Sequence, residues 1–378
     1  MSALPTVISG RPTYDVIVVG ARCAGSPTAM LLARLGYRVL VVDRATFPSD
    51  SMRAHLVRGG GITSLERWGL LGKVAASGCP PLHRITVDLG DFPLTMPVAA
   101  REGVGTMYGP RRFVLDAILV EAAAVAGAEV REGFTVHEVV REGGRVVGIR
   151  GAVRGGREVT ERARLVIGAD GMYSLVASAV SAPVYDVHPT SACTYYGYFG
   201  DVPVEGGWIA YHPDHFAVAI PTNDGLALVA VATPIARFAE FKTDLEGAFF
   251  RTLSRVPWIA AHVRPERRAE RWRGSGDLPT FFRKPYGPGW ALVGDAGYHR
   301  DPIPAQGISD AFRDAELLVG AIAAGFEGQM PLEEAMAVYE RRRNEAARPT
   351  YEEAVARAAF RPFPPEVYAQ RATLRPAA

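Results

Sequence analysis

The chain has 378 residues, a formal net charge of +2, 48% hydrophobic and 22% charged residues, which is an ordinary globular composition. A charge this close to zero gives no reason to expect nucleic acid or a membrane surface as a partner, and no apolar run approaches the ~20 residues that cross a bilayer. The three cysteines lie far apart and form no CxxC pair, which excludes a disulfide framework and predicts a cytoplasmic protein.

The first elements predict a strand, a helix and a second strand. Residues 15–20, "DVIVVG", form a short β-branched run closed by glycine, as in a buried parallel strand. Residues 24–35 predict a helix that ends at Gly36, and residues 38–43, "RVLVVD", predict another buried strand. Together they form a βαβ unit with a glycine turn inside it.

The glycine turn points to a nucleotide. Gly20 permits a tight bend and Gly25 permits close packing of strand and helix, whose free N–H groups can face a pyrophosphate. Asp43 follows the second strand, where an acid accepts a hydrogen bond from a ribose 2′-OH and repels a 2′-phosphate. The adenosine of FAD or NAD is therefore expected. Arg22 replaces the usual middle glycine, so its guanidinium is expected to turn outward or toward an anion.

After the βαβ unit, the predicted secondary structure changes twice: from mixed helices and strands to an antiparallel sheet, and then back to a buried strand with long helices. Helices are predicted at 61–72 and 112–126, and strands within 82–98 and at 129–141, 145–152 and 164–169. From about 184 to 275, short alternating runs separated by turn signals predict an antiparallel sheet. A buried strand returns at 290–294, followed by long helices at about 307–324 and 332–360, the second broken near Pro349.

Three motifs in order carry a family resemblance. They are "VVGARCAG" with "VVDR", "RLVIGADGMYS" at 164–174, and "WALVGDAGYHRDPIPAQGISDAFRDA" at 290–315. Over most of residues 14–345 the chain resembles the class A flavoprotein monooxygenases, the p-hydroxybenzoate hydroxylase-like superfamily. That superfamily also contains flavin-dependent halogenases and geranylgeranyl reductases.

The resemblance implies an α/β fold: a Rossmann-like FAD-binding domain with a parallel sheet, an inserted antiparallel β-sheet substrate domain, and C-terminal helices. The FAD-binding domain would comprise residues 1–80, 105–183 and 276–345. The substrate domain would comprise residues 81–104 and 184–275, and residues 346–378 would form a C-terminal helical segment. The expected assembly is a monomer or a homodimer.

The resemblance also implies the residues that bind FAD. In the turn and at the adenosine they are Gly20, Arg22, Cys23, Ala24, Gly25, Asp43, Arg44 and Val136. Near the pyrophosphate, ribityl chain and flavin they are Arg53, Arg112, Asp170, Gly171 and Asp295. At the N-terminus of a helix beside the flavin pyrimidine they are Pro302, Ala305, Gln306, Gly307 and Ile308. The chain departs from the family pattern at Arg22, and also at Ala305, Ser309 and Tyr298.

The implied activity is that of an FAD-dependent monooxygenase, a hydroxylase or epoxidase in which reduced FAD and O2 form a flavin hydroperoxide. Its substrate would be a hydrophobic or aromatic small molecule. No second glycine fingerprint exists, so NADH or NADPH would bind only transiently as electron donor.

Candidate catalytic residues are His55, which the resemblance places beside the isoalloxazine, Tyr211 and His215. Tyr195, Tyr196 and Tyr198 are further candidates for substrate contact. The plainer alternative is that these aromatic residues pack a sheet face and that "HPDH" is a hairpin turn. No metal site is expected, because His212 and His215 have no further ligands nearby in the sequence.

Other flavin activities remain open. A reductase of the geranylgeranyl reductase type is the main alternative. Halogenation is disfavoured because Phe216 and Val218 replace both tryptophans of the halogenase motif Trp-x-Trp-x-Ile-Pro. A non-catalytic flavin-binding module is the third alternative.

Overall fold

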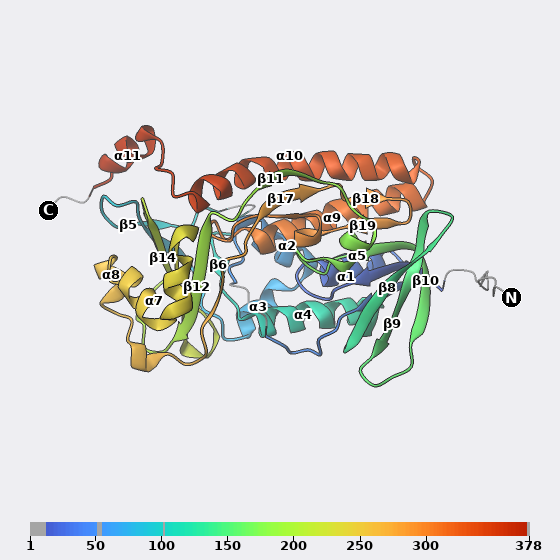
Figure 1. Ribbon diagram of the computed structural model, residues 1–378, viewed down its shortest axis with the longest axis horizontal. Coiled ribbons are helices and arrows are strands. Elements are labelled where there is room, and N and C mark those ends of the chain that lie inside the picture. Colours follow the sequence, from blue (N-terminus) through green and yellow to red (C-terminus); the bar gives the residue numbers. More distant parts are fainter. Residues whose placement is uncertain (1–12, 51–54, 101–102, 376–378) are drawn as a thin grey trace.

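The computed structural model describes residues 13–50, 55–100 and 103–375. The molecule is elongated and has two lobes along its long axis (Figure 1). One lobe contains an eight-stranded sheet and the other a seven-stranded sheet. Helix α10, Leu332–Ala358, lies along one side of the molecule and reaches from one lobe to the other.

The predicted βαβ unit is confirmed at the start of the described chain. It consists of β1 (Tyr14–Val19), α1 (Gly25–Arg34) and β2 (Val39–Val42). The two strands pair in parallel, and every residue of β2 is buried. A strand buried on both faces needs a continuous apolar run, which is why this segment was recognisable from its sequence.

The eight-stranded sheet has the order β18-β19-β10-β1-β2-β7, with the β8–β9 hairpin continuing from β10. The remaining strands are β7 (Glu129–Arg131), β8 (Phe134–Glu142), β9 (Arg145–Val153), β10 (Val159–Gly168), β18 (Tyr286–Gly287) and β19 (Trp290–Leu292). β1 lies between two parallel neighbours, β10 and β2.

Helices and the hairpin cover the two faces of this sheet. Val16 and Val18 face α1, α4 (Arg112–Val125), α9 (Gly307–Phe326) and α10, while Ile17 faces the hairpin and α5 (Leu175–Ala179). Successive side chains of a strand point to opposite faces, so each face receives its own apolar layer.

Two sequence predictions about helices need correction. The helix expected at 61–72 is two helices, α2 (Gly59–Trp68) and α3 (Leu71–Ala76), because Gly69 adopts φ +76° and ends the first. Helix α10 is not broken at Pro349, which lies inside it. Arg343, Ala347 and Tyr351 form a buried face of α10 on either side of the proline, and this packing holds the helix together.

The seven-stranded sheet has the order β16-β12-β15-β14-β13-β4-β5. Its strands are β4 (Arg84–Asp88), β5 (Leu94–Pro97), β12 (Ala192–Phe199), β13 (Gly207–His212), β14 (His215–Pro221), β15 (Ala227–Pro234) and β16 (Arg273–Ser275). All pairs are antiparallel except β13 with β4. The predicted antiparallel sheet is confirmed, and segment 84–97 adds two strands to it.

Three helices that the sequence analysis missed cover the outer face of this sheet. They are α6 (Phe238–Thr243), α7 (Leu245–Leu253) and α8 (Pro257–Ala260). Phe241 and Phe249 pack there with Tyr195 and Val231. Each helix is short and stabilised by tertiary packing, which leaves little periodic signal in the sequence.

Smaller elements join the lobes. β3 (Pro81–Leu82) pairs with β6 (Met107–Tyr108), and β17 (Thr280–Arg283) pairs with both β11 (Val184–His188) and β20 (Tyr298–His299). α11 (Pro365–Ala372) follows α10. The short 3-10 turns are η1 (Asn223–Gly225), η2 (Ile235–Arg237), η3 (Pro265–Arg267) and η4 (Gly294–Ala296).

In the part of the chain that is described, no helix is both long and apolar enough to span a bilayer.

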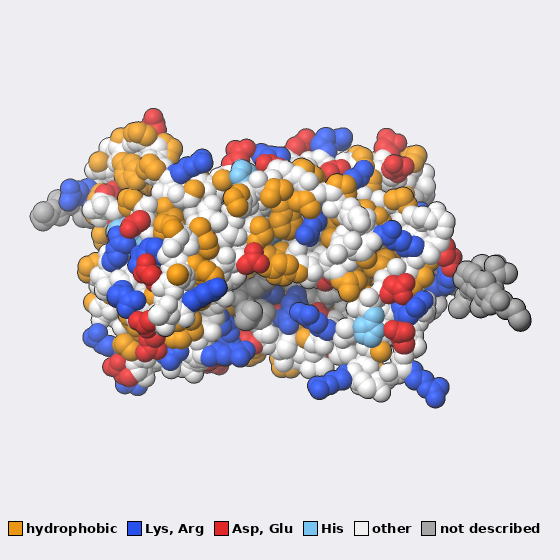
Figure 2. All heavy atoms as spheres, in the orientation of Figure 1, with side chains coloured by type: hydrophobic (Ala, Val, Ile, Leu, Met, Phe, Trp, Pro, Cys, Tyr) orange, Lys and Arg blue, Asp and Glu red, His pale blue; other side chains and the backbone are white. Residues whose placement is uncertain are grey.

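The α/β fold class predicted from the sequence is confirmed: a Rossmann-type layer, an antiparallel sheet and C-terminal helices. The domain boundaries stay a prediction. Figure 2 shows one face of the molecule hollowed between the two lobes, with basic side chains at the margin of the hollow.

Candidate functional site

The glycine turn after β1 has the geometry of a nucleotide cradle. Gly20 has φ +103°, and a Cβ on Gly25 would lie 1.7 Å from the carbonyl oxygen of Gly20. Neither position tolerates a side chain, so helix α1 begins directly against the end of the strand. Backbone N–H groups at this helix start are therefore available to a pyrophosphate.

Asp43 supports the turn from the end of β2. Its Oδ2 accepts a hydrogen bond from the Ala21 N–H over 2.8 Å, and its Oδ1 accepts one from the Ala45 N–H over 2.8 Å. A carboxylate has about four acceptor positions, so it can still accept from a ribose hydroxyl. Arg44, its neighbour, is exposed.

Arg22 turns away from the cradle and toward a buried anion. Its Nη1 lies 2.6 Å from Oδ2 of Asp116, and its Nη2 donates to Oγ of Ser49 over 3.0 Å. Asp116 is fully buried in α4, where Nη2 of Arg112 donates to its Oδ1 over 2.9 Å and Cys23 Sγ approaches the same oxygen at 3.4 Å. Two guanidinium groups share one carboxylate, which leaves one net positive charge beside the turn.

The segment before α9 contains a residue in the left-handed conformation and leads to an exposed glycine at the start of the helix. Ala305 adopts φ +52°, a left-handed conformation that costs a non-glycine residue about 1–2 kcal/mol, at the position where the family commonly has glycine. Its N–H donates to the Pro302 carbonyl over 2.8 Å. Gln306 precedes the first turn of the helix, and a Cβ on Gly307 would meet no atom within 4 Å. Ile308, the next residue, is buried.

Two buried carboxyl groups near these segments have an oxygen without a partner. Oδ2 of Asp170 accepts from the Leu175 N–H over 2.7 Å, while its Oδ1 is buried and unpaired. Oδ1 of Asp301 accepts from the Ile303 N–H over 3.0 Å, while its Oδ2 is also buried and unpaired. Burial raises the pKa of Asp170 and raises that of Asp301 to about 7.

The other predicted cofactor residues are spread around the same lobe. Gly171 has φ +84° directly after Asp170, and Val136 lies on β8 in the buried layer beneath β1 and β2. Asp295 lies in η4 and is partly buried, and Ala24 precedes α1. Arg53 lies outside the described residues.

His55 is completely enclosed rather than exposed to a solvent-filled pocket. Its side chain is 1% exposed, with Nδ1 lying 2.9 Å from the Gly109 carbonyl and Nε2 lying 2.8 Å from the Tyr198 hydroxyl. A carbonyl only accepts, so Nδ1 carries the proton and Nε2 accepts from Tyr198. Burial lowers the pKa of His55 to about 3, so the imidazole is neutral. It can orient Tyr198 but is not a ready proton donor.

Tyr198 belongs to a charged network that sequence reasoning missed. Arg111 lies 4.2 Å above its ring and Arg273 lies 5.3 Å from it. Arg111 pairs with Glu270, and Arg273 reaches Glu270 at 2.9 Å and Asp50 at 2.5 Å. The network joins three distant segments of the chain, so no local pattern announces it. The Arg112–Asp116 pair could have been found from the sequence, because the two residues are four apart on a predicted helix and such residues are neighbours on a helix surface.

The two faces of the seven-stranded sheet separate the predicted substrate residues. Tyr196 and Tyr198 point to the inner face, with Val218, Ile220 and Ala230. Tyr195 points to the outer face and stacks on Phe241 at 4.7 Å. The hydroxyl of Tyr196 is buried and has no hydrogen-bond partner. The same is true of Oγ1 of Thr194, which lies on the same face.

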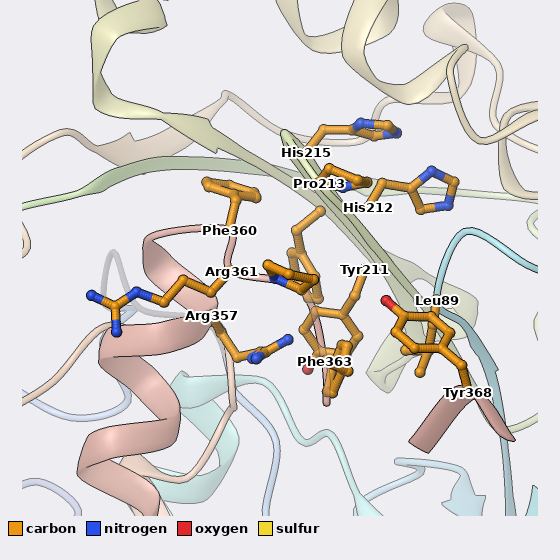
Figure 3. A pocket seen from close by; sticks show the side chains of 12 residues that line it. Leu89, Tyr211, His212, Pro213, His215, Arg357, Phe360, Arg361, Phe363 and Tyr368 are labelled. Carbon is orange, nitrogen blue, oxygen red and sulfur yellow. The ribbon is translucent and has the colours of Figure 1, made fainter. Parts of the chain in front are cut away.

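Tyr211 and His215 lie elsewhere, at the far end of the β13–β14 hairpin. Both line a hollow closed by the segment after α10 (Figure 3). His215 points to the outer face, where its Nδ1 lies 2.9 Å from Oδ1 of Asp214. Tyr211, which pairs with Phe216, points to the opposite face, so the two residues border the same hollow from different sides of the hairpin, and neither is grouped with His55. Within the described ranges, no group of three His, Cys, Asp or Glu side chains is placed to hold a metal ion.

These observations fit a bound flavin nucleotide. A turn that a Cβ would fill, a residual positive charge, an open approach to Gly307 and unpaired buried carboxyl oxygens all lie in one lobe. Fold and site together define an FAD-dependent oxidoreductase. The chain belongs to the FAD binding domain family, whose sequence profile matches residues 13–354. The resemblance predicted from the motifs is confirmed at this level.

The relatives and structural neighbours include a reductase, a monooxygenase and a halogenase. The chain is 27% identical over 337 residues to digeranylgeranylglycerophospholipid reductase 1 of Methanococcoides burtonii, covering 83% of this chain and 75% of the relative. It is 27% identical over 373 residues to 6-methylpretetramide 4-monooxygenase of Streptomyces rimosus, covering 89% and 82%. The myxobacterial chondrochloren halogenase CndH has a similar structure, with a TM-score of 0.83, 25% identity and coverage of 97% and 90%.

Proposed function

We propose that this protein is an FAD-dependent monooxygenase, a hydroxylase or epoxidase, that acts on a hydrophobic or aromatic small molecule. NADH or NADPH would serve as transient electron donor and O2 as co-substrate. The observation that carries the proposal is the inner face of the seven-stranded sheet, which is apolar yet holds the buried, unpaired hydroxyl of Tyr196. An unpaired buried hydroxyl is costly, which favours a bound molecule as its partner.

The cofactor residues named above would hold FAD in the other lobe. The turn at Gly20 and Gly25 would receive the pyrophosphate, and the positive charge left by Arg22 and Arg112 on Asp116 would favour its binding. The N-terminus of α9 would face the flavin pyrimidine. Bound FAD supplies the redox chemistry, accepting electrons from a nicotinamide and activating O2 once reduced.

The protein groups would then orient the substrate and exclude water. His55, held by the Gly109 carbonyl, fixes the hydroxyl of Tyr198 on the inner face. The unpaired hydroxyls of Tyr196 and Thr194 would bind a polar group of the substrate, with its apolar body against Val218 and Ala230. No step here requires Tyr211 or His215, whose catalytic role stays a prediction.

Reduction of a prenyl chain is the second candidate, and the similarity to a digeranylgeranylglycerophospholipid reductase favours it. The two activities differ in what consumes the electrons. We expect NAD(P)H oxidation stimulated by substrate to consume one O2 per NAD(P)H, and a product heavier by one oxygen atom. Anaerobic turnover that yields a product heavier by two hydrogens would replace the proposal with the reductase.

Tyr196→Phe tests the substrate site. Because its hydroxyl is unpaired, the free energy of unfolding should stay equal or rise slightly, while KM for the stimulating substrate rises ~5–10-fold, the effect of one lost hydrogen bond. Tyr195→Phe on the opposite face of the same strand is the matched control and should leave KM unchanged. Equal KM values for the two variants would place the substrate elsewhere.

A further inference from the structure

Two hydrogen-bond donors without acceptors lie side by side on the inner face of the seven-stranded sheet. Tyr196 of β12 and Arg273 of β16 are directly opposite each other in the antiparallel pair, so their side chains point to the same face. Tyr196 is 3% exposed and Arg273 is 8% exposed. Among the described residues, neither the Tyr196 hydroxyl nor Nη1 of Arg273 has a hydrogen-bond partner, and both atoms are buried.

The other terminal nitrogen of Arg273 is engaged. Its Nη2 lies 2.5 Å from Oδ2 of Asp50 and 2.9 Å from Oε2 of Glu270. Its guanidinium carbon lies 5.3 Å from the centre of the Tyr198 ring. These contacts hold the guanidinium in place while Nη1 remains without an acceptor. Because a guanidinium has donors only, Nη1 needs an acceptor from another molecule.

The Tyr196 hydroxyl also remains a donor. Burial raises the pKa of Tyr196 well above its usual value, so the phenol keeps its proton. Its oxygen could accept from Nη1 of Arg273, yet the two side chains form no hydrogen bond. The nearby Tyr198 hydroxyl is already committed, because it donates to Nε2 of His55. Two neighbouring donors are therefore left for one acceptor.

The charges around this donor pair favour an acceptor without a net charge. Arg273 pairs with Asp50 and Glu270, as described above. Arg111 pairs with the same two carboxylates, and its Nη1 lies 3.9 Å from Oδ2 of Asp224. Three carboxylates thus surround two guanidinium groups, and they would repel a further anion. A carbonyl oxygen has two lone pairs and no charge, which suits two adjacent donors.

The donor pair lies on the face of the sheet that contacts the FAD lobe. Ile303, from the segment before α9, belongs to one apolar cluster with Ala192 of β12. Ala192 and Tyr196 are four residues apart on this strand, so their side chains point to the same face. The neighbours of Tyr196 on this face include the apolar side chains of Ile220 and Ala230. This environment suits a molecule with an apolar body and a single polar oxygen.

We propose that Tyr196 and Arg273 together bind a carbonyl oxygen of the substrate, and so select an uncharged carbonyl compound with an apolar body. Buried donors are costly unless a ligand or an ordered water supplies the acceptor. Identifying the bound molecule as a substrate rests on the proposed monooxygenase function, whereas the binding of carbonyl compounds by this pair does not.

Matched probes test the acceptor without turnover. Oxidised holoenzyme is titrated calorimetrically with 2-acetylnaphthalene, with 2-ethylnaphthalene, which lacks the oxygen, and with 2-naphthoate, which carries a charge. 1-Tetralone and tetralin form a second pair of ketone and hydrocarbon. We expect at least one ketone to bind ~10-fold or more tightly than its hydrocarbon, because two hydrogen bonds, one from a charged donor, are lost with the oxygen.

Three results of these titrations would overturn the proposal. They are failure of both ketones to bind, equal binding of each ketone and its hydrocarbon, and tighter binding of 2-naphthoate than of 2-acetylnaphthalene.

Two variants each remove one donor. Tyr196→Phe removes the hydroxyl, while Arg273→Lys keeps a positive charge beside Asp50 and Glu270 but loses the planar guanidinium and its Nη1. Each variant should lower the preference for ketone over hydrocarbon ~5-fold or more and leave hydrocarbon binding unchanged. A general loss of fold would instead weaken both probes alike. Arg271→Lys, at an exposed position just before β16, is the control and should keep the wild-type preference.

The variants also decide whether the donors hold an ordered water only. If the preference for ketone persists in Tyr196→Phe and in Arg273→Lys, the carbonyl binds elsewhere and the proposal fails. Loss of the preference in only one of the two variants would likewise contradict a shared acceptor.

The same measurements separate this site from the proposed activity. If ketones bind through both residues but no compound stimulates NAD(P)H oxidation, the site stands and the monooxygenase proposal fails. If a substrate is oxygenated with the same KM in Arg273→Lys as in wild type, and neither ketone binds, the activity stands and the carbonyl site fails.

Discussion

Arg22 donates to Asp116 over 2.6 Å, and this contact resolves how an arginine fits the second position of a glycine turn. The side chain leaves the cradle and reaches into α4, so only its backbone remains beside the nucleotide site. Asp116 also pairs with Arg112, so one buried carboxylate fixes both a turn residue and the start of a helix. The turn keeps its N–H groups and gains positive charge.

Removing Asp116 should therefore destabilise the protein strongly. Asp116→Ala leaves two arginines without their shared partner, and we expect the free energy of unfolding to fall by ~3–5 kcal/mol. FAD should also dissociate more readily, because the turn loses its anchor. Urea unfolding and the fluorescence of released FAD measure the two effects.

Glu121→Ala is the matched control for that experiment. Glu121 lies on the same helix and pairs with Lys73 at 2.9 Å, but its side chain is 59% exposed. An exposed pair contributes under ~1 kcal/mol, so the variant should resemble wild type. Equal effects of the two substitutions would show that Asp116 has no special role.

Gly307 provides a test of the cofactor position. A Cβ there meets no atom within 4 Å, so Gly307→Ala should leave the protein folded and gain up to ~1 kcal/mol of helix propensity. If the flavin edge lies against the α9 N-terminus, the added methyl group should still weaken FAD binding ~10-fold, since close approach to backbone requires glycine. Titration of flavin-free protein with FAD measures this.

Gly320→Ala controls for the change in helix propensity. Gly320 is exposed on the same helix, and a Cβ there would also meet no atom within 4 Å. The substitution should stabilise the helix to a similar extent and leave FAD affinity unchanged. If both variants bind FAD like wild type, the flavin does not contact Gly307.

The buried His55 should make stability depend on pH. Burial lowers the pKa of His55 to about 3, below the ~6.5 of an exposed histidine. The unfolded chain binds the extra proton between these values, so the stabilising contribution is complete above pH ~6.5 and is lost as pH falls toward 3. His55→Gln keeps a donor and an acceptor but removes the titration.

Urea unfolding at pH 7 and pH 5 measures that effect. The loss of unfolding free energy between the two pH values should be about 2 kcal/mol smaller in His55→Gln than in wild type. His83→Gln, at an exposed position, should change nothing. If wild type and His55→Gln lose the same free energy, the imidazole is not held neutral by burial.

The chain's local patterns predicted much of the FAD lobe. The run at 15–20, the glycines at 20 and 25 and the strand ending in Asp43 were recognisable because a buried parallel strand and a tight turn each depend on neighbours in sequence. Ala305 adopts the left-handed conformation at the position where the family motif usually has glycine, so the motif pointed to the unusual backbone there. The roles of individual residues in binding FAD remain predictions.

Other features depended on packing between distant segments. The three helices over the outer sheet face are short and acquire their stability from Tyr195 and Val231 beneath them. Helix α10 runs through Pro349 because its buried face is anchored on both sides. The helix propensity of the local sequence contributes less to stability than this tertiary packing, so propensity alone predicts such helices poorly.

The sequence by itself determined the βαβ unit, the order of motifs and the α/β class, because each follows from contacts between residues close in the chain. Only the tertiary structure decided which polar and charged side chains meet. Arg22 and Asp116 are 94 residues apart, and His55 and Tyr198 are 143 apart. It also placed the buried Arg357 over the ring of Phe363, since burial is a property of the assembled core and not of the residues beside it in the sequence.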